Sequence, residues 1–307
     1  MMNKRRIGTS DLYVSEIGLG CMSLGTDEQK AIRLIHEALE RGINYLDTAD
    51  LYDRGLNEEF VGKALKGKRD QVVLATKVGN RWNNDGNGWF WDPSKAHIKT
   101  AVKESLRRLQ TDYIDLYQLH GGTIDDPIDE TIEAFEELKQ EGVIRHYGIS
   151  SIRPNVIREY VKRSNIVSVM MQYSLLDRRP EELFPLLKEH KISVIARGPV
   201  AKGLLTERPL EAASESVKQH GYLDYTYEEL QLLLPTLKER TAPNRSLTAA
   251  ALQFCLYDSV VAAAIPGASS LEQLAENIAA ASAHKLTQDE YEWLRQQTKA
   301  SVYEAHR

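Results

Sequence analysis

Apolar residues recur along the chain in two alternating patterns. Short and nearly continuous apolar runs, such as residues 71–77 and 192–197, are typical of strands that are buried on both faces. Between such runs lie segments with apolar side chains at helical spacing, such as residues 27–41. The alternation of strands and helices predicts a parallel sheet that is covered by helices.

The pattern repeats eight times, which favours closure of the sheet into a (β/α)8 TIM barrel that occupies residues 1–307 as one domain. The predicted strands are 17–20, 43–46, 71–77, 113–120, 143–150, 166–172, 192–197 and 260–265, and the predicted helices are 27–41, 57–65, 93–109, 128–140, 154–162, 181–189, 246–256 and 271–281. An open doubly wound sheet is the alternative. It is less favoured because Gly18 and Gly20 are followed by Cys21 and Met22, without the third glycine of a dinucleotide-binding turn.

Three further segments surround these repeats. Residues 4–7 and 12–15 flank a polar turn and predict a β-hairpin that could plug one end of the barrel, and we expect an extra helix at the C-terminus. Residues 206–227 have no clean period and are predicted to form a long loop. The tryptophan-rich residues 82–91 are predicted to form a loop that lines an apolar substrate cleft or packs onto the barrel.

Composition narrows the choice of partners. The chain has 307 residues, 42% of them hydrophobic and 27% charged, with a net charge of -5 and a pI near 6.0. This charge offers no basic surface for nucleic acid or anionic membrane, so small molecules or other proteins are expected. Cys21 and Cys255 lack metal-ligand spacing, and we find neither a secretory signal nor a membrane-length apolar run. We therefore expect a cytoplasmic protein.

Polar side chains stand at the C-terminal ends of several predicted strands. Asp47 and Tyr52 follow one strand, Lys77 ends the next, and His120 ends a third. Because these ends meet at one mouth of a barrel, we expect the four side chains to converge. An ammonium group near a phenol favours its phenolate form, and a carboxylate keeps the ammonium charged. The resulting proton donor suits a carbonyl oxygen that gains negative charge, which predicts carbonyl reduction by hydride transfer.

Each of these residues also has a plainer interpretation. Asp47 is able to cap a loop, Lys77 to be a solvated strand end, and His120 to be a structural histidine. A lysine that forms a Schiff base is a third possibility in barrels. A metal site formed by His120 and the aspartates is least favoured, because no second histidine lies at ligand spacing.

The motifs together resemble those of the aldo-keto reductase superfamily, and most of all its short-loop bacterial members. The matching stretches are Arg6-x-Gly8-x-Ser10, Asp47-Thr48-Ala49-x-x-Tyr52, Ala75-Thr76-Lys77, Asp115-Leu116-Tyr117-Gln118-Leu119-His120, Gly148-Ile149-Ser150, Ile265-Pro266-Gly267 and Glu276-Asn277. The resemblance implies that Tyr52 is the general acid, that Asp47 and Lys77 tune it, and that His120 orients the substrate. It also implies NADPH as the cofactor, extended across the barrel mouth.

Two departures from the family pattern concern the nicotinamide end. Where family members have Ser-Asn, this chain has Ser150-Ser151, and Met170 stands in place of a glutamine. Gln172 lies on the same strand face as Met170 and is expected to substitute. Arg197 replaces the aromatic residue that stacks on nicotinamide, and its planar guanidinium could stack while disfavouring the oxidised cofactor.

The resemblance assigns the rest of the cofactor to three turns. We expect the pyrophosphate at Gly198, Pro199, Val200, Ala201, Lys202 and Gly203, the 2′-phosphate at Ser269 and Ser270, and the ribose and adenine at Gln273 and Asn277. Further cofactor contacts are expected at Gly20, Cys21, Met22, Asp47 and Gly267. The 267–273 loop lacks the basic residue that commonly binds the 2′-phosphate of NADPH, so NADH remains open. The alternative function is a nicotinamide-binding regulatory module of the channel β-subunit type. The substrate is expected to be a small carbonyl compound and the protein a monomer or weak oligomer.

Overall fold

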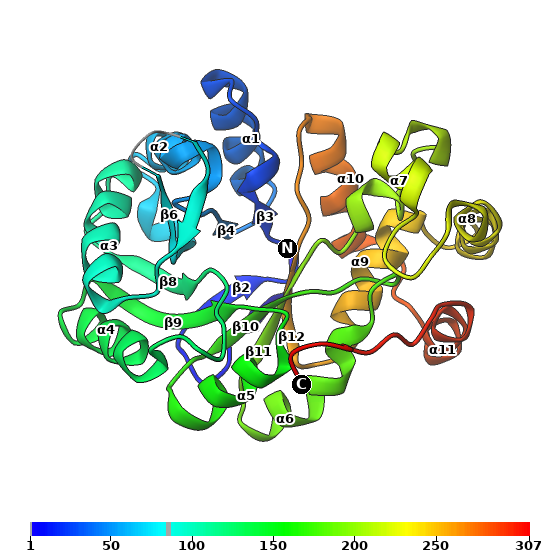
Figure 1. Ribbon diagram of the computed structural model, residues 1–307. Helices are drawn as coiled ribbons and strands as arrows, with labels where there is room; N and C mark the ends of the chain where they lie inside the picture. Colours follow the sequence, from blue (N-terminus) through cyan, green and yellow to red (C-terminus); the bar gives the residue numbers. More distant parts are fainter. Residues whose placement is uncertain (1, 84–86) are drawn as a thin grey trace.

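A closed barrel of parallel strands forms the centre of the protein (Figure 1). The computed structural model describes residues 2–83 and 87–307. Within this part, eight strands form one parallel sheet, in the order β3 (Leu19–Gly20), β4 (Tyr45–Asp47), β5 (Val73–Val78), β8 (Ile114–Leu119), β9 (Ile144–Ser150), β10 (Ser168–Gln172), β11 (Ser193–Arg197) and β12 (Val261–Ile265). The predicted TIM barrel is confirmed.

The seam between the first and last strands closes through the backbone. Gly20 N–H donates to the Pro266 carbonyl at 3.1 Å, and a parallel bridge joins Gly20 to Gly267. Side chains have no room here, since a Cβ atom on Gly267 would lie 2.2 Å from Ser23 Oγ. Glycine at this position therefore allows the segment that follows β3 to pack closely against the end of the seam.

Helices surround the barrel, as Figure 1 shows. One helix follows each barrel strand, with the bounds α1 (Glu28–Glu40), α2 (Leu56–Ala64), α3 (Lys95–Leu109), α4 (Ile128–Gln140), α5 (Pro154–Arg163), α6 (Phe184–Glu189), α9 (Leu247–Tyr257) and α10 (Leu271–Ser282). Short 3-10 helices η1 (Cys21–Ser23), η2 (Tyr52–Gly55), η3 (Arg69–Gln71) and η4 (Arg179–Leu183) lie in the connections. No helix of the described residues is long and apolar enough to cross a membrane.

The segment after β11 differs from its prediction. Residues 206–227 do not form a long loop, because they contain the 3-10 helix η6 (Leu210–Ala212) and the helix α7 (Glu215–His220). Another helix, α8 (Tyr227–Thr241), follows and was not predicted. The sequence did not indicate this helix, because Pro235 lies inside it and because the apolar Leu232 is 77% exposed instead of lying on the buried face. The expected C-terminal helix is present as α11 (Gln288–Gln297).

The tryptophan-rich segment is a second place where local order exceeds the prediction. Here β6 (Asn80–Trp82) and β7 (Trp89–Trp91) pair as an antiparallel hairpin, with Trp82 opposite Trp89. Residues 84–86 of the predicted 82–91 loop lie outside the described residues.

The N-terminal hairpin closes the end of the barrel opposite the carboxyl ends of the strands. It consists of β1 (Lys4–Arg6) and β2 (Tyr13–Ser15), and its turn buries Ile7 and Leu12 in one apolar cluster with the barrel residues Val73, Leu116 and Val167. The predicted plug is therefore confirmed.

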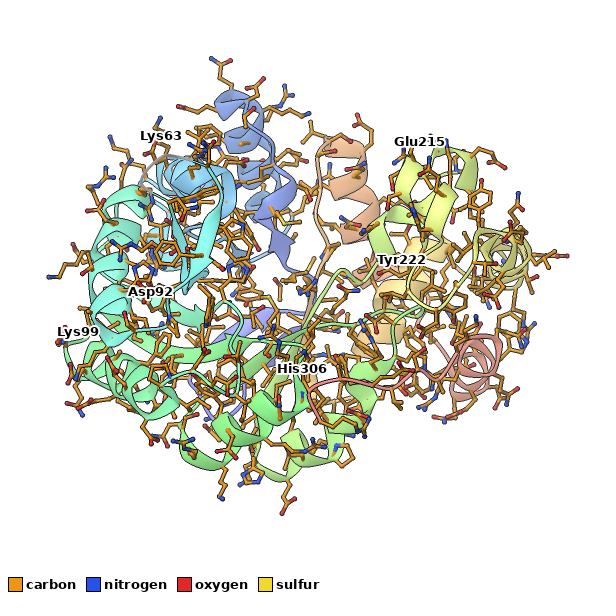
Figure 2. The ribbon with its side chains drawn as sticks, viewed as in Figure 1. Lys63, Asp92, Lys99, Glu215, Tyr222 and His306 are labelled. Atoms are coloured by element: carbon orange, nitrogen blue, oxygen red, sulfur yellow. The ribbon has the colours of Figure 1, made fainter. Side chains whose placement is uncertain are left out.

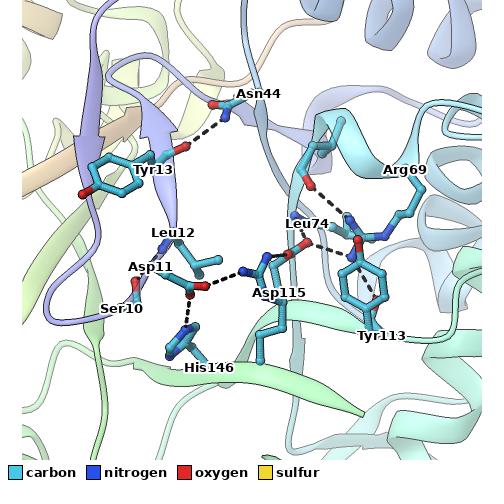
Figure 3. Close-up of polar contacts among 12 residues, drawn as sticks. Ser10, Asp11, Leu12, Tyr13, Asn44, Arg69, Leu74, Tyr113, Asp115 and His146 are labelled. Carbon is cyan, nitrogen blue, oxygen red and sulfur yellow. Dashed lines mark hydrogen bonds and ion pairs between the residues drawn. The ribbon is translucent and has the colours of Figure 1, made fainter. Parts of the chain in front are cut away.

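A polar network holds this hairpin in place (Figure 3). Asp115 on β8 is 2% exposed and pairs with Arg69 at 2.7 Å and with Arg145 at 2.8 Å. Arg145 and His146 in turn contact Asp11 in the hairpin turn, at 2.7 and 2.8 Å. Because the buried carboxylate has two cationic partners, the network links the hairpin rigidly to three strand ends.

Candidate active site

Three of the four predicted catalytic side chains meet at one ammonium group. Lys77 Nζ, on β5, lies 2.5 Å from Asp47 Oδ1 at the end of β4 and 3.1 Å from the Tyr52 hydroxyl in η2. The carbonyl oxygen of Thr48 accepts a further hydrogen bond from Nζ at 2.7 Å. All three donor positions of the ammonium are thus occupied, which fixes it beneath the phenol.

Burial explains the charge states in this cluster. Lys77 is 1% exposed, so it is not the solvated strand end that its position alone would allow. Burial by itself would lower the pKa of Lys77, but the Asp47 charge and the Tyr52 hydroxyl raise it to about 12. Burial raises the pKa of Asp47, and the Lys77 charge opposes that rise. The pair is best described as a buried ion pair with a cationic lysine.

His120 completes the group from the next strand. Its ring lies edge-on to that of Tyr52, with the centroids 5.8 Å apart. Burial, followed by the charges of Lys77 and Arg197, lowers the pKa of His120 to about 3. Its Nδ1 is buried and has no hydrogen-bond partner among the described residues. A neutral imidazole at this position is able to offer a hydrogen bond to a substrate oxygen without carrying charge.

A strained turn places Tyr52 over the lysine. Asp53 and Arg54 have φ values of 48° and 57°, and Gly55 has 87°. A Cβ atom on Gly55 would lie 2.7 Å from the Arg108 side chain, which packs under the turn and pairs with Glu58 at 2.7 Å. Consecutive residues in this region of φ are costly outside functional sites. The support from α2 and α3 therefore fixes the position of the phenol.

The sequence prediction missed one residue that contacts this cluster. Gln118 Nε2 donates to Asp47 Oδ2 at 3.0 Å and so leaves Oδ1 to the lysine. Gln118 lies on β8 and precedes His120, the first residue after that strand, by two positions, so the period of two in an extended chain could have identified it. No group of three or more histidine, cysteine, aspartate or glutamate side chains in residues 2–83 and 87–307 is arranged to hold a metal ion.

The residues predicted to hold nicotinamide lie on three neighbouring strands. Ser150 and Ser151 end β9, Gln172 ends β10, and Arg197 ends β11, where Gln172 and Arg197 are register partners. Met170 is buried in the barrel interior, and Gln172 extends beyond it toward the mouth. The two strand ends are joined by side chains, because Arg197 Nη1 donates to Gln172 Oε1 at 3.0 Å.

The turn predicted to hold pyrophosphate has a left-handed backbone at several residues. Gly198, Ala201, Lys202 and Gly203 have φ values of 63°, 48°, 56° and 88°. The N–H groups of Ala201 and Gly203 already donate within the turn, to the carbonyls of Gly198 and Val200. A Cβ atom on Gly203 would meet nothing within 4 Å, so the turn borders open space. Such a turn fits an anion, with the remaining N–H groups and the exposed Lys202 as its donors.

The residues predicted for the adenosine end lie across the barrel seam from η1. Asn277 Nδ2 donates to the Gly267 carbonyl at 3.1 Å, and Ser269 N–H donates to Gln273 Oε1 at 2.8 Å. Met22 in η1 is 65% exposed, whereas the Cys21 side chain is buried. Cys21 is thus limited to backbone contacts with a ligand, and the oxygen of Gln273 is already engaged by the loop.

The aromatic residues of β7 differ in whether they pack onto the barrel or remain exposed, the two possibilities that the sequence left open. Trp91 packs inward, since its ring limits the space at Gly79 and Gly121 and its Nε1 donates to both carboxylate oxygens of Asp126 at 3.0 Å. Trp89 and Phe90 are 52% and 43% exposed. Trp91 therefore anchors the hairpin, whereas Trp89 and Phe90 remain available to a ligand.

Comparison with known proteins places this geometry in a family. Residues 16–298 match the model of the Aldo/keto reductase family. The chain is 66% identical over 306 residues to the uncharacterized oxidoreductase YqkF of Bacillus subtilis, covering 100% of each chain. It is 33% identical over 305 residues to the NADH-specific methylglyoxal reductase of Escherichia coli, covering 91% of this chain and 93% of the relative.

Solved structures give the same result. The holo form of the aldo-keto reductase AKR11C1 from Bacillus halodurans matches with a TM-score of 0.94 and 65% identity, over 100% of this chain and 99% of the other. Its apo form matches over the same shares with a TM-score of 0.86 and 62% identity. An aldo/keto reductase from Klebsiella pneumoniae in complex with NADP and acetate has a TM-score of 0.76 and 28% identity, over 99% of this chain and 98% of the other. The chain therefore belongs to the aldo/keto reductase family and is an NAD(P)H-dependent oxidoreductase.

Proposed function

We propose that the protein reduces aldehydes or activated ketones to alcohols, using NADPH as the hydride donor and Tyr52 as the general acid. The observation that carries this proposal is the buried contact of Lys77 with both Asp47 and the Tyr52 hydroxyl. A phenol held 3.1 Å from a buried cation is a proton donor in a cationic environment. That environment suits a carbonyl oxygen that becomes an alkoxide.

In this mechanism each residue has a separate task. The bound reduced nicotinamide supplies the hydride. Tyr52 donates its hydroxyl proton to the substrate oxygen, Lys77 stabilises the negative charge that remains on the phenol, and Asp47 holds Lys77 in its cationic form. Neutral His120 donates a hydrogen bond to the same substrate oxygen and orients the carbonyl group. Trp89 and Phe90 provide the apolar surface for the rest of the substrate.

The residues around the mouth fit an extended dinucleotide. We propose that Ser150, Ser151, Gln172 and Arg197 contact the nicotinamide, that the 198–203 turn contacts the pyrophosphate, and that Gly267, Ser269, Gln273 and Asn277 contact the adenosine. Gly20, Cys21 and Met22 border the same seam.

NADPH is proposed over NADH on the strength of the NADP complex of the Klebsiella relative. Ser269 and Ser270, at the N-terminus of α10, are the groups able to contact a 2′-phosphate in this loop. The NADH-specific relative from Escherichia coli shows that the family also includes the opposite preference. Fluorescence titration with both cofactors decides the question, and tighter binding of NADH would contradict our assignment.

The test of the proposed function is the turnover of 4-nitrobenzaldehyde with NADPH by the wild type and by Tyr52→Phe. Removing the hydroxyl should lower the rate of hydride transfer by about 100-fold or more, with the dissociation constant of NADPH changed by less than about twofold. Absence of turnover in the wild type with a panel of aldehydes, despite cofactor binding, would favour a nicotinamide-binding regulatory module. Near-normal turnover of the variant would contradict the role of Tyr52.

A further inference from the structure

A chain of polar side chains runs from Arg197 away from the catalytic group. Arg197 Nη1 donates to Gln172 Oε1 at 3.0 Å, and Gln172 Nε2 donates to Asp177 Oδ2 at 3.0 Å. Asp177 accepts two further hydrogen bonds, both at 2.7 Å, from Nε and Nη2 of Arg179. Hydrogen bonds thus link four side chains into one chain. Only Arg197 and Gln172 belong to the proposed cofactor site.

Asp177 determines which way the Gln172 amide faces. Its carboxylate accepts hydrogen bonds but donates none, and its side chain is fully buried, at 0% exposure. It therefore selects the orientation with Nε2 toward Asp177 and Oε1 toward the guanidinium of Arg197. The reverse orientation would place the amide NH2 against the guanidinium and the amide oxygen against the carboxylate, two repulsive contacts in a buried setting.

Asp177 itself is held from two sides. Its backbone exchanges hydrogen bonds with Ser174 at 3.0 and 3.1 Å, which closes the turn after β10. The guanidinium of Arg179 lies 5.1 Å from the ring centroid of Tyr303 in the C-terminal segment. Gln172, rather than Asp177, has a further partner in the Tyr222 hydroxyl, which lies 3.5 Å from Gln172 Nε2, and Figure 2 shows Tyr222 on the inner side of α7 and α8. The carboxylate is therefore fixed independently of the cofactor site.

If the proposed function is correct, a rigidly held Arg197 affects how tightly each redox form of the cofactor binds. A guanidinium beside the nicotinamide repels the oxidised ring, which is positively charged, and tolerates the neutral reduced ring. The strength of this discrimination depends on a fixed short separation, because a long arginine side chain that is free to turn toward solvent is screened by water.

We propose that Asp177 is a positioning residue that acts through Gln172 to hold Arg197 against the nicotinamide, and that it thereby sets the preference of the protein for the reduced cofactor. Asp177 touches neither the substrate nor the cofactor in this role. The measurable quantity is the dissociation constant of NADP⁺ divided by that of NADPH. The two cofactors differ only at the ring, so this ratio reports on the nicotinamide end alone.

The test compares this ratio in four single variants and one double variant, using quenching of protein fluorescence by each cofactor. Asp177→Asn should lower the ratio by about three- to tenfold, because the new amide NH2 is able to turn the Gln172 amide around and release Arg197. Arg179→Lys retains the positive charge without the two-point contact and should give a smaller decrease in the same direction. Should Asp177→Asn fail to fold, which thermal unfolding reveals, Arg179→Lys decides the question.

A matched control lies in the same turn. Glu181 pairs with Arg178 through two contacts of 3.0 Å, and this pair contacts Arg295 of α11 rather than Gln172. Glu181→Gln weakens a carboxylate–guanidinium pair of similar geometry and should leave the ratio within about twofold of the wild type. If Asp177→Asn weakens the binding of both cofactors equally, Asp177 is merely structural and the inference is wrong.

Arg197→Met separates this inference from the proposed function. It should lower the ratio at least as much as Asp177→Asn, and the double variant should show no further decrease, since both changes act through one guanidinium. A lowered ratio in Arg197→Met with an unchanged ratio in Asp177→Asn and Arg179→Lys would overturn the role of Asp177 and leave the proposed site intact. An unchanged ratio in Arg197→Met, or no binding of either cofactor by the wild type, would contradict the proposed site itself.

Discussion

Replacing Lys77 by methionine tests the buried ion pair most directly. Methionine retains most of the side-chain volume and removes the ammonium, which lies 2.5 Å from Asp47 Oδ1 while both residues are almost fully buried. Removing one partner of a buried pair costs about 3–5 kcal/mol, because the other charge is left without compensation. That is a large fraction of the ~5–15 kcal/mol that stabilises a typical domain. We therefore expect Lys77→Met to fold with markedly reduced stability.

A double-mutant cycle separates the interaction free energy of Lys77 with Asp47 from the effect of each substitution on its own. Asp47→Asn alone should also destabilise the protein, since it leaves Lys77 buried beside a neutral amide. In Lys77→Met with Asp47→Asn, no charge remains to be stranded, so the double variant should lose at least about 2 kcal/mol less than the sum of the single variants. Urea unfolding of the cofactor-free protein, followed by tryptophan fluorescence and circular dichroism, measures these free energies.

Activity gives a second measurement on the same variants. Without the cation the phenol is a weaker proton donor, so single-turnover hydride transfer in Lys77→Met should slow by about 100-fold or more. The reasoning would be refuted if the unfolding free energy of Lys77→Met lay within about 1 kcal/mol of the wild type. Strict additivity in the cycle would equally show that the two residues do not depend on each other.

Three further predictions concern other parts of the molecule. The pKa of His120 is about 3 in the folded protein against an ordinary 6.5, so the unfolded chain binds this proton first as the pH falls, and stability is lost below pH 6.5. Between pH 7 and pH 5 the free energy of unfolding of the wild type, measured in urea, should fall by about 2 kcal/mol more than that of His120→Asn. Equal losses in the two proteins would contradict the buried neutral state of His120. Ser269→Arg should raise the ratio of NADPH to NADH affinity about tenfold by adding a charged contact to the 267–273 loop, which fluorescence titration measures, and an unchanged ratio would place the 2′-phosphate elsewhere. Leu12→Ala in the plug should cost about 2–5 kcal/mol in unfolding free energy, because Leu12 is 1% exposed within the barrel cluster; a smaller loss would show that the hairpin contributes little.

Convergence of the proposed catalytic residues could be predicted because it follows from topology. Asp47, Lys77 and His120 end neighbouring parallel strands, and the ends of such strands meet at one mouth whatever the intervening helices do. Tyr52 could be added because it follows Asp47 closely and because the motif resembles that of a known family. Gln118 was within reach of the same reasoning, since alternate residues of a strand share a face.

Contacts between irregular segments could not be predicted in this way. Asp177 and Arg179 lie in a turn, and Tyr222 lies in a segment whose helices have no clear hydrophobic period. Their meeting depends on how far each loop reaches, which neither period nor propensity encodes. The helix α8 was missed for a related reason, since Leu232 is exposed while Leu230, Leu234 and Leu237 are buried, and Pro235 interrupts the run.

The backbone seam between the first and last strands has a consequence for biosynthesis. Residues 16–20 hydrogen-bond to residues 264–267, so the ring of strands stays open until residues 264–267 have left the ribosome. Contacts so distant in sequence form slowly, because a very long loop must close before they contribute. Until β12 has formed, the edges of β3 and β11 present unpaired backbone groups to other molecules. The nascent chain is thus most vulnerable to aggregation while seven strands of the barrel have formed and β12 is still missing.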